Sequence, residues 1–170
     1  MGVFEVIEKR RSIRKYRSQP LDQMNINRIL EAARLAPSAA NCQPWHFIVV
    51  TDPETRQKMK NVYDRDWFVS APLILIGCAD PEDGWVRRDG ENYSEIDVAI
   101  AMQNMVLVAT ELGLGTCWVA DFDEAAIHQI LQIPEAKKIV AIITVGYPDT
   151  IKGVVTDRKS LNEIVHFEKW

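Results

Sequence analysis

Residues 94–112 read SEIDVAIAMQNMVLVATEL, and apolar residues fall on nearly every side of the helix that this stretch predicts. Mainly Gln103 and Asn104 interrupt the apolar surface. A helix that is apolar all round is buried on all sides, which in a chain of 170 residues indicates an interface as well as a core. The start of the stretch, residues 94–97, resembles a capping box and predicts Ser94 as the N-cap.

The segments around this helix predict a mixture of strands and further helices. Apolar runs at 46–51, 73–78 and 138–145 are typical of buried strands, and 116–119 reads as extended chain. A short helix is expected over 3–7, a second from Asp22 until Pro37, a third from Asp52 to about Tyr63 and a fourth over 121–131. Residues 80–94 lack a period and are expected to form a loop or lid. The fold class is therefore α/β or α+β.

Length and composition indicate one ordinary domain over residues 1–170. The chain is 47% hydrophobic and 26% charged with a net charge of −4, which excludes intrinsic disorder. Its three cysteines make no disulfide framework, which favours a reducing compartment. No apolar run approaches the roughly 20 residues of a membrane span, and the N-terminus does not resemble a signal peptide. We expect a cytoplasmic protein with no membrane partner.

The first unusual segment is strongly basic. Six of the nine residues from Lys9 to Arg17 are Lys or Arg, although the whole chain is acidic. A bound dianion such as a phosphate would hold these charges together, with Arg10, Arg11, Arg14 and the Ser12 hydroxyl as donors. A solvated face or a nucleic-acid patch explains the same composition. No further basic stripe supports nucleic-acid binding.

The second unusual segment is the loop from Ala36 to His46, which reads APSAANCQPWH. Its small residues would let a flat ligand approach the backbone, and the amides of Asn41 and Gln43 could bind polar ligand edges. A plain connector between a helix and a strand explains the same residues.

Other chemistries find little support. Gly113 and Gly115 close a helix before a strand, so they indicate a helix C-cap and not a dinucleotide fingerprint. The histidines are far apart in sequence and do not have the spacing of a zinc site, so we expect no metal; they are His46, His128 and His166. Cys42 and Cys117 are interpreted as packing residues. An anionic, planar ligand without a side-chain catalyst fits an organic cofactor that carries the reaction itself.

Taken in order, several segments resemble the FMN-dependent nitroreductase family. They are Arg10-Arg11-Ser12-Ile13-Arg14, Ala36–Trp45, Gly113–Trp118, Gly146-Tyr147-Pro148, and Arg158 together with Val165–Trp170. The resemblance implies an α+β fold with a mainly antiparallel central sheet flanked by helices. It also implies an intertwined homodimer with two FMN sites at the subunit interface.

The resemblance assigns cofactor-binding roles to particular residues. Arg10, Ser12 and Arg158 would hold the FMN phosphate, with Arg11 in support, and Arg14 would reach the flavin pyrimidine edge. Pro37, Ser38 and Asn41 would come from the other subunit, and Gln43 would support their loop. Trp118, Val119 and Ala120 would line the flavin near N5. No residue is assigned as an acid or base catalyst.

The implied activity is a ping-pong oxidoreduction. NADH or NADPH would deliver a hydride to flavin N5, and a small-molecule acceptor such as a nitroaromatic or quinone would then take it. Three alternatives stay open: the same fold with dehalogenating or flavin-fragmenting chemistry, an FMN-binding module without turnover, and a nucleic-acid binder that uses residues 9–17.

Overall fold

The computed structural model describes residues 1–170, the whole chain. Its elements are, in order, α1 (Val3–Lys9), α2 (Gln23–Arg34), η1 (Ala39–Asn41), β1 (Trp45–Val50), α3 (Pro53–Lys58), η2 (Met59–Asn61), α4 (Asp66–Ser70), β2 (Leu73–Ala79), α5 (Ser94–Glu111), β3 (Gly115–Val119), α6 (Glu124–Leu131), β4 (Lys138–Gly146) and α7 (Leu161–Ile164). None of these helices has the length and apolar character that crossing a membrane requires.

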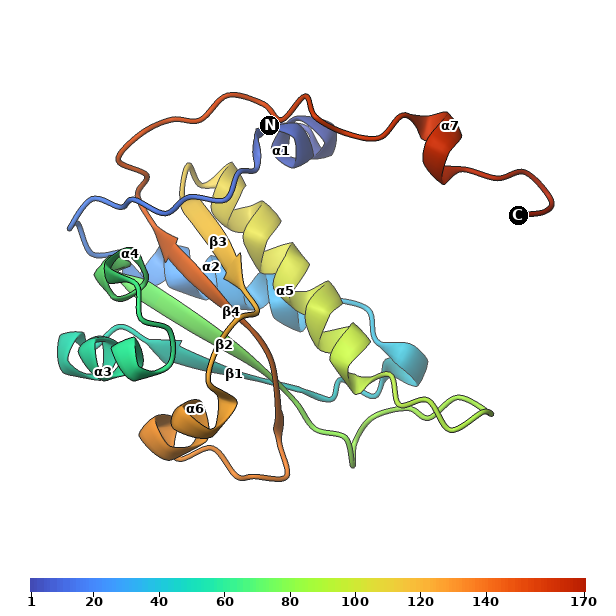
Figure 1. Cartoon of the computed structure of the whole chain (residues 1–170), viewed down its shortest axis with the longest axis horizontal. Helices are drawn as coiled ribbons and strands as arrows, with labels where there is room; N and C mark the ends of the chain where they lie inside the picture. Colours follow the sequence, from blue (N-terminus) through green and yellow to red (C-terminus); the bar gives the residue numbers. More distant parts are fainter.

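The four strands form one sheet in the order β1-β2-β4-β3, and every neighbouring pair is antiparallel (Figure 1). The expected α+β fold with an antiparallel central sheet is confirmed. The arrangement leaves β1 and β3 as edge strands. A segment outside the sheet can therefore pair with β3.

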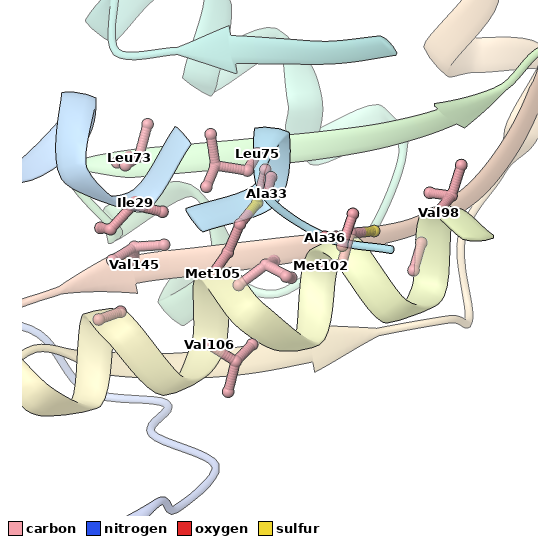
Figure 2. Packing of buried hydrophobic residues seen from close by; sticks show 14 of the residues in the cluster. Ile29, Ala33, Ala36, Leu73, Leu75, Val98, Met102, Met105, Val106 and Val145 are labelled. Atoms are coloured by element: carbon pink, nitrogen blue, oxygen red, sulfur yellow. The ribbon is translucent and has the colours of Figure 1, made fainter. Parts of the chain in front are cut away.

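Buried side chains form one cluster on each face of the sheet, because successive residues of a strand point to opposite faces. In β2, Leu73 and Leu75 join a cluster of 17 buried residues with α2 and α5, whereas Ile74 and Ile76 join a cluster of 13 with η2, α4 and α6. Figure 2 shows the first cluster, with the side chains of α5 facing those of α2, β2 and β4. The continuous apolar run of β2 is thus explained by burial on both faces.

Gly77 allows α5 to pack closely on β2. A Cβ atom at this position would overlap the Met102 sulfur and lie 3.0 Å from Val98 Cγ1. The pairing of β2 with β4 shifts register between Gly77 and Cys78, next to this close approach. A larger residue at position 77 would force the helix off the sheet.

Two expected helix starts are wrong. The N-cap of α5 is Tyr93, whose own side chain makes no capping bond, and Asn92 Oδ1 accepts a hydrogen bond from the Ser94 amide at 2.9 Å. Asp97 turns toward another part of the chain and accepts a hydrogen bond from the Ala39 amide. The last long helix begins at Glu124 with Asp123 as its N-cap, three residues later than Asp121 at the start of the expected range 121–131. In contrast, Asp22 caps α2 as expected.

An apolar stripe on α5 stays uncovered in the single chain. Ile96 is 44% exposed and Ile100 is 38% exposed, and Leu107 lies half-buried farther along the same face. The adjoining α1 exposes Val3 and Phe4. The expectation that α5 is buried on all sides therefore fails for one chain, and the uncovered stripe is typical of an interface.

Two segments extend away from the sheet. Residues 80–94 form a small ordered excursion, where Val86 pairs with Asn92 and Arg87 contacts both Asp89 and Tyr93. The chain after β4 crosses above α1 and ends beyond it with α7 (Figure 1). All residues from 161 to 170 are exposed.

Candidate functional site

A surface pocket of about 180 Å³ collects the predicted phosphate-binding residues. Its lining residues are Arg10, Arg11, Ser12, Arg14, Lys152, Val155 and Arg158. The first four follow α1, and the last three belong to the chain after β4. Two segments about 140 positions apart in sequence thus meet in one basic pocket, here named the anion pocket.

Residues 12 and 13 pair with the edge strand β3. Ser12 bridges to Thr116, and the Ile13 amide donates to the Thr116 carbonyl at 2.8 Å. Gly115 makes this approach possible, because a Cβ there would lie 2.7 Å from Ile13 Cγ1. Ile13 is buried, whereas Arg14 is exposed. The pairing with β3 therefore buries the apolar residue and leaves its basic neighbour outside.

Tyr16 holds the far end of the same segment. Its hydroxyl donates to the Ile13 carbonyl at 2.6 Å and forms a hydrogen bond with Thr144 Oγ1 at 2.7 Å. Burial raises the pKa of Tyr16 well above its usual value, so the hydroxyl stays protonated. The segment is thus fixed to β4 as well as to β3.

Five of the six cations of the basic segment divide into two groups. Lys9 pairs with Glu5 and Lys15 with Asp149, each at 2.6 Å, and neither lysine lines the anion pocket. The arginines that line the pocket form no ion pair within the chain; they are Arg10, Arg11, Arg14 and Arg158. No carboxylate lines the pocket. Four such guanidinium groups together favour a multiply charged anion as their ligand.

Lys152 is a pocket residue that sequence reasoning missed. Its ammonium group donates to the Ser12 carbonyl at 2.9 Å, which ties the chain after β4 to the basic segment. The sequence offered one signal, a basic residue six positions before Arg158. Its contribution depends on an irregular bend that periodicity does not reveal.

The predicted flavin-lining residues lie at the end of β3. Trp118 is 38% exposed, Val119 is buried and Ala120 is exposed. The guanidinium of Arg14 lies 5.7 Å from the ring centroid of Trp67, which belongs to α4. This contact places Trp67 beside the basic segment. Burial raises the pKa of Cys117, while the nearby cations Arg14 and Lys152 act in the opposite direction, and the net effect keeps the thiol neutral.

The predicted ligand loop, residues 37–43, is a compact turn with its own hydrogen bonds. The Gln43 amide donates to Ser38 Oγ at 2.9 Å, and Gln43 Nε2 donates to the Asn41 carbonyl at 3.2 Å. Pro37, Asn41 and Gln43 are exposed, and Ser38 is half-buried. Gln43 is therefore hydrogen-bonded within the loop, and the other side chains stay accessible.

One chain does not bring this loop to the anion pocket. The loop is bonded to Asp97 in the first turn of α5, whereas Ser12 pairs with Thr116 just beyond the last turn. An 18-residue helix spans about 27 Å at about 1.5 Å per residue. The two groups lie at opposite ends of α5 (Figure 1).

The fold is shared with solved structures over its whole length. A nitroreductase family protein from Clostridium difficile 630 superimposes with a TM-score of 0.94 at 30% identity, and the match covers 100% of both chains. A structure from Clostridium difficile R20291, described as an FMN-dependent nitroreductase, gives a TM-score of 0.85 at 31% identity and covers 98% of this chain and 99% of that one.

Curated relatives carry several functional names. A candidate NADH dehydrogenase/NAD(P)H nitroreductase from Archaeoglobus fulgidus is 34% identical over 98% of this chain and 97% of its own length. More distant relatives include 5,6-dimethylbenzimidazole synthase from Rhodospirillum rubrum at 28% identity, over 86% of this chain and 82% of the relative. Iodotyrosine deiodinase 1 from Rattus norvegicus is 25% identical, over 95% of this chain and 68% of the relative. The model of the Nitroreductase family matches residues 7–72 and 60–147. The chain therefore belongs to the nitroreductase family.

Proposed function

We propose that this protein is an FMN-dependent NAD(P)H oxidoreductase. The observation that carries the proposal is the anion pocket, where arginines without carboxylate partners surround Ser12. Ser12 pairs with β3, the strand that also carries Trp118 and Val119. Two similar proteins support it, one described as an FMN-dependent nitroreductase and one named for NAD(P)H. On this proposal residues 1–170 act as one domain in the cytoplasm.

The chemistry of the donor set fits the phosphate of FMN. A phosphate dianion can accept hydrogen bonds from several guanidinium groups and a hydroxyl at once, and the anion pocket offers both. On this proposal Arg10, Ser12 and Arg158 bind the phosphate, while Arg11 supports them. Lys152, which already holds the Ser12 carbonyl, adds a further positive charge.

The ring of FMN would lie farther along β3, beside Trp118, Val119 and Ala120. Arg14 would face the pyrimidine edge, where a cation stabilises negative charge on the reduced ring. When bound, FMN supplies the hydride-accepting and hydride-donating chemistry between NAD(P)H and a nitroaromatic or quinone acceptor. The chain's own residues bind and orient the ring, and no side chain is assigned a proton-transfer role.

We further propose that each site is shared by two protomers of a homodimer. The anion pocket of one protomer would meet the 37–43 loop of its partner, because the two lie at opposite ends of α5 within one chain. The exposed apolar stripe of α5 and the apolar residues of α1 supply the surface for such an assembly. Pro37, Ser38 and Asn41 would then contact the cofactor from the partner.

The visible spectrum of the purified protein tests the function. A yellow protein whose flavin band bleaches under anaerobic NADH or NADPH is the expected result. A colourless protein that also fails to bind added FMN contradicts the proposal. A yellow protein that neither nucleotide bleaches supports a binding module without turnover.

A second candidate is the same cofactor with another chemistry, as the names of the deiodinase and synthase relatives suggest. The ordered excursion at 80–94 favours this second candidate, because a lid that binds one specific substrate needs side chains in fixed positions. Trp85 and Tyr93 pack edge to face, and Arg87 binds Asp89. Halide release from halogenated phenols, or fragmentation of reduced flavin by oxygen, would distinguish this candidate from simple electron transfer.

A further inference from the structure

Two aspartates are the acidic side chains buried in this protein, and their surroundings differ. Asp80 is 5% exposed, pairs with Lys137 and accepts a hydrogen bond from the Glu82 amide. Asp97 is 2% exposed, and its Oδ1 accepts one hydrogen bond, from the Ala39 amide at 3.0 Å. Its Oδ2 is buried without any hydrogen-bond partner. Asp97 thus has no cation to compensate its burial.

The one hydrogen bond that Asp97 accepts holds the 37–43 loop, whose backbone is unusual. Ala40, Asn41 and Gln43 all have positive φ values, of 49°, 58° and 55°. Such conformations persist only where the surroundings fix them. Most hydrogen bonds of the loop are internal, and the bond to Asp97 ties it to α5. The aspartate therefore connects a strained loop to a rigid helix.

Burial of a carboxylate with an unpaired oxygen is unfavourable for stability. An apolar residue at position 97 would avoid that cost but would release the Ala39 amide. An asparagine would keep an oxygen acceptor and remove the buried charge. Asp97 thus fixes the position of the loop and lowers the free energy of unfolding in doing so.

We propose that Asp97 is a positioning residue for the cofactor, which fixes the loop that presents Ser38 and Asn41 to FMN. This inference rests on the proposed function, since the loop has a ligand only if FMN binds. Asp97 acts through the loop backbone and makes no contact with the cofactor itself. Its effect is therefore visible in the loop before any cofactor is added.

The test compares Asp97→Ala and Asp97→Asn with the wild-type protein. The control is Asp52→Ala, which removes a similar side-chain bond to a backbone amide, that of Thr55, at the N-cap of α3. Two quantities are measured: amide hydrogen exchange of Ala39 in the FMN-free protein, and the FMN dissociation constant from flavin fluorescence.

We expect Asp97→Ala to accelerate exchange at Ala39 about tenfold and to weaken FMN binding about fivefold. Asp97→Asn should stay within about threefold of wild type in both measurements, since it keeps the acceptor. Asp52→Ala should lower thermal stability and leave FMN binding unchanged. If Asp97→Ala binds FMN as tightly as the wild type, or if both Asp97 variants lose the same FMN affinity, this inference is overturned and the proposed function still stands. A wild-type protein that binds no FMN overturns the proposed function and this inference with it.

Discussion

The anion pocket and the 37–43 loop are both assigned to one cofactor, yet they are built in opposite ways. The pocket is assembled within one chain, where residues 10–14 and 152–158 converge on β3. The loop presents exposed side chains at the other end of α5 and meets no part of the pocket. On the proposed function, a protomer therefore carries a complete phosphate-binding half and an incomplete ring-binding half.

The largest effect is expected from breaking the proposed assembly. Ile100→Glu places a charge in the exposed stripe of α5, and burial of an unpaired charge costs several kcal/mol. The variant should be monomeric by sedimentation and should lose FMN although its anion pocket is intact.

Gln57→Glu, which adds a charge on exposed α3, is the matched control and should stay dimeric with FMN. A monomeric Ile100→Glu variant that binds FMN normally would show that one chain suffices.

The next effect concerns the pocket itself. Arg10→Ala and Arg158→Ala should each weaken FMN binding by about 1.5–3 kcal/mol, because each removes a charge-assisted hydrogen bond. Lys15→Ala removes a cation of the same segment that pairs with Asp149 outside the pocket, so it should leave FMN affinity nearly unchanged. Equal effects of all three, measured by fluorescence titration, would mean that net charge alone matters.

A change on the strand should disturb the pocket indirectly. Gly115→Val would place a Cβ atom 2.7 Å from Ile13 Cγ1. Overpacking of this kind lowers the free energy of unfolding by about 1–3 kcal/mol. Thermal unfolding should show this loss, and FMN binding should weaken as well. Gly153→Ala, where the added carbon meets nothing within 4 Å, should unfold like the wild type.

Lys152→Ala should have a smaller effect than the arginine variants. Its ammonium group already donates a hydrogen bond to the Ser12 carbonyl and would bind the phosphate less fully than an arginine. The loss in FMN binding free energy should therefore be about 1 kcal/mol. An effect as large as that of Arg158→Ala would show that Lys152 is a principal phosphate ligand.

The smallest effect concerns the loop. Ala40 has a φ of 49°, a conformation that costs a non-glycine residue roughly 1 kcal/mol, so Ala40→Gly should raise the melting temperature slightly. Ala125→Gly, at an exposed position in the first turn of α6, should lower it slightly, because glycine has a lower helix propensity than alanine. A loss of stability in both would show that the left-handed turn is not populated in solution.

Local patterns predicted most of the fold and the grouping of some of the candidate site residues. The strands, the caps at Asp22 and Asp52, and the grouping of Arg10, Ser12 and Arg14 follow from short-range spacing and motif order. These features depend on neighbours in sequence. The grouping of Arg158 with them came from the family resemblance.

Contacts between distant residues escaped prediction. The capping-box interpretation failed because the Asp97 side chain bonds to Ala39, 58 positions away. Lys152 and the approach of Arg14 to Trp67 depend on irregular segments that no periodicity describes. The length of α5 was predictable from the sequence. The separation of the anion pocket from the 37–43 loop was not, because it depends on the hydrogen bond between the Ala39 amide and Asp97 in the first turn of α5.

Subunit complementation tests most directly whether the site combines two chains. A pocket variant, Arg10→Ala with Arg158→Ala, and a loop variant, Ser38→Glu, should each fail to retain FMN alone. Unfolding the two together and refolding them in equal amounts should form heterodimers in which one site has an intact pocket and an intact loop. About one FMN per four chains is then expected, since about half of the dimers would be mixed. A mixture that retains no FMN, although the chains have exchanged, would contradict the shared site.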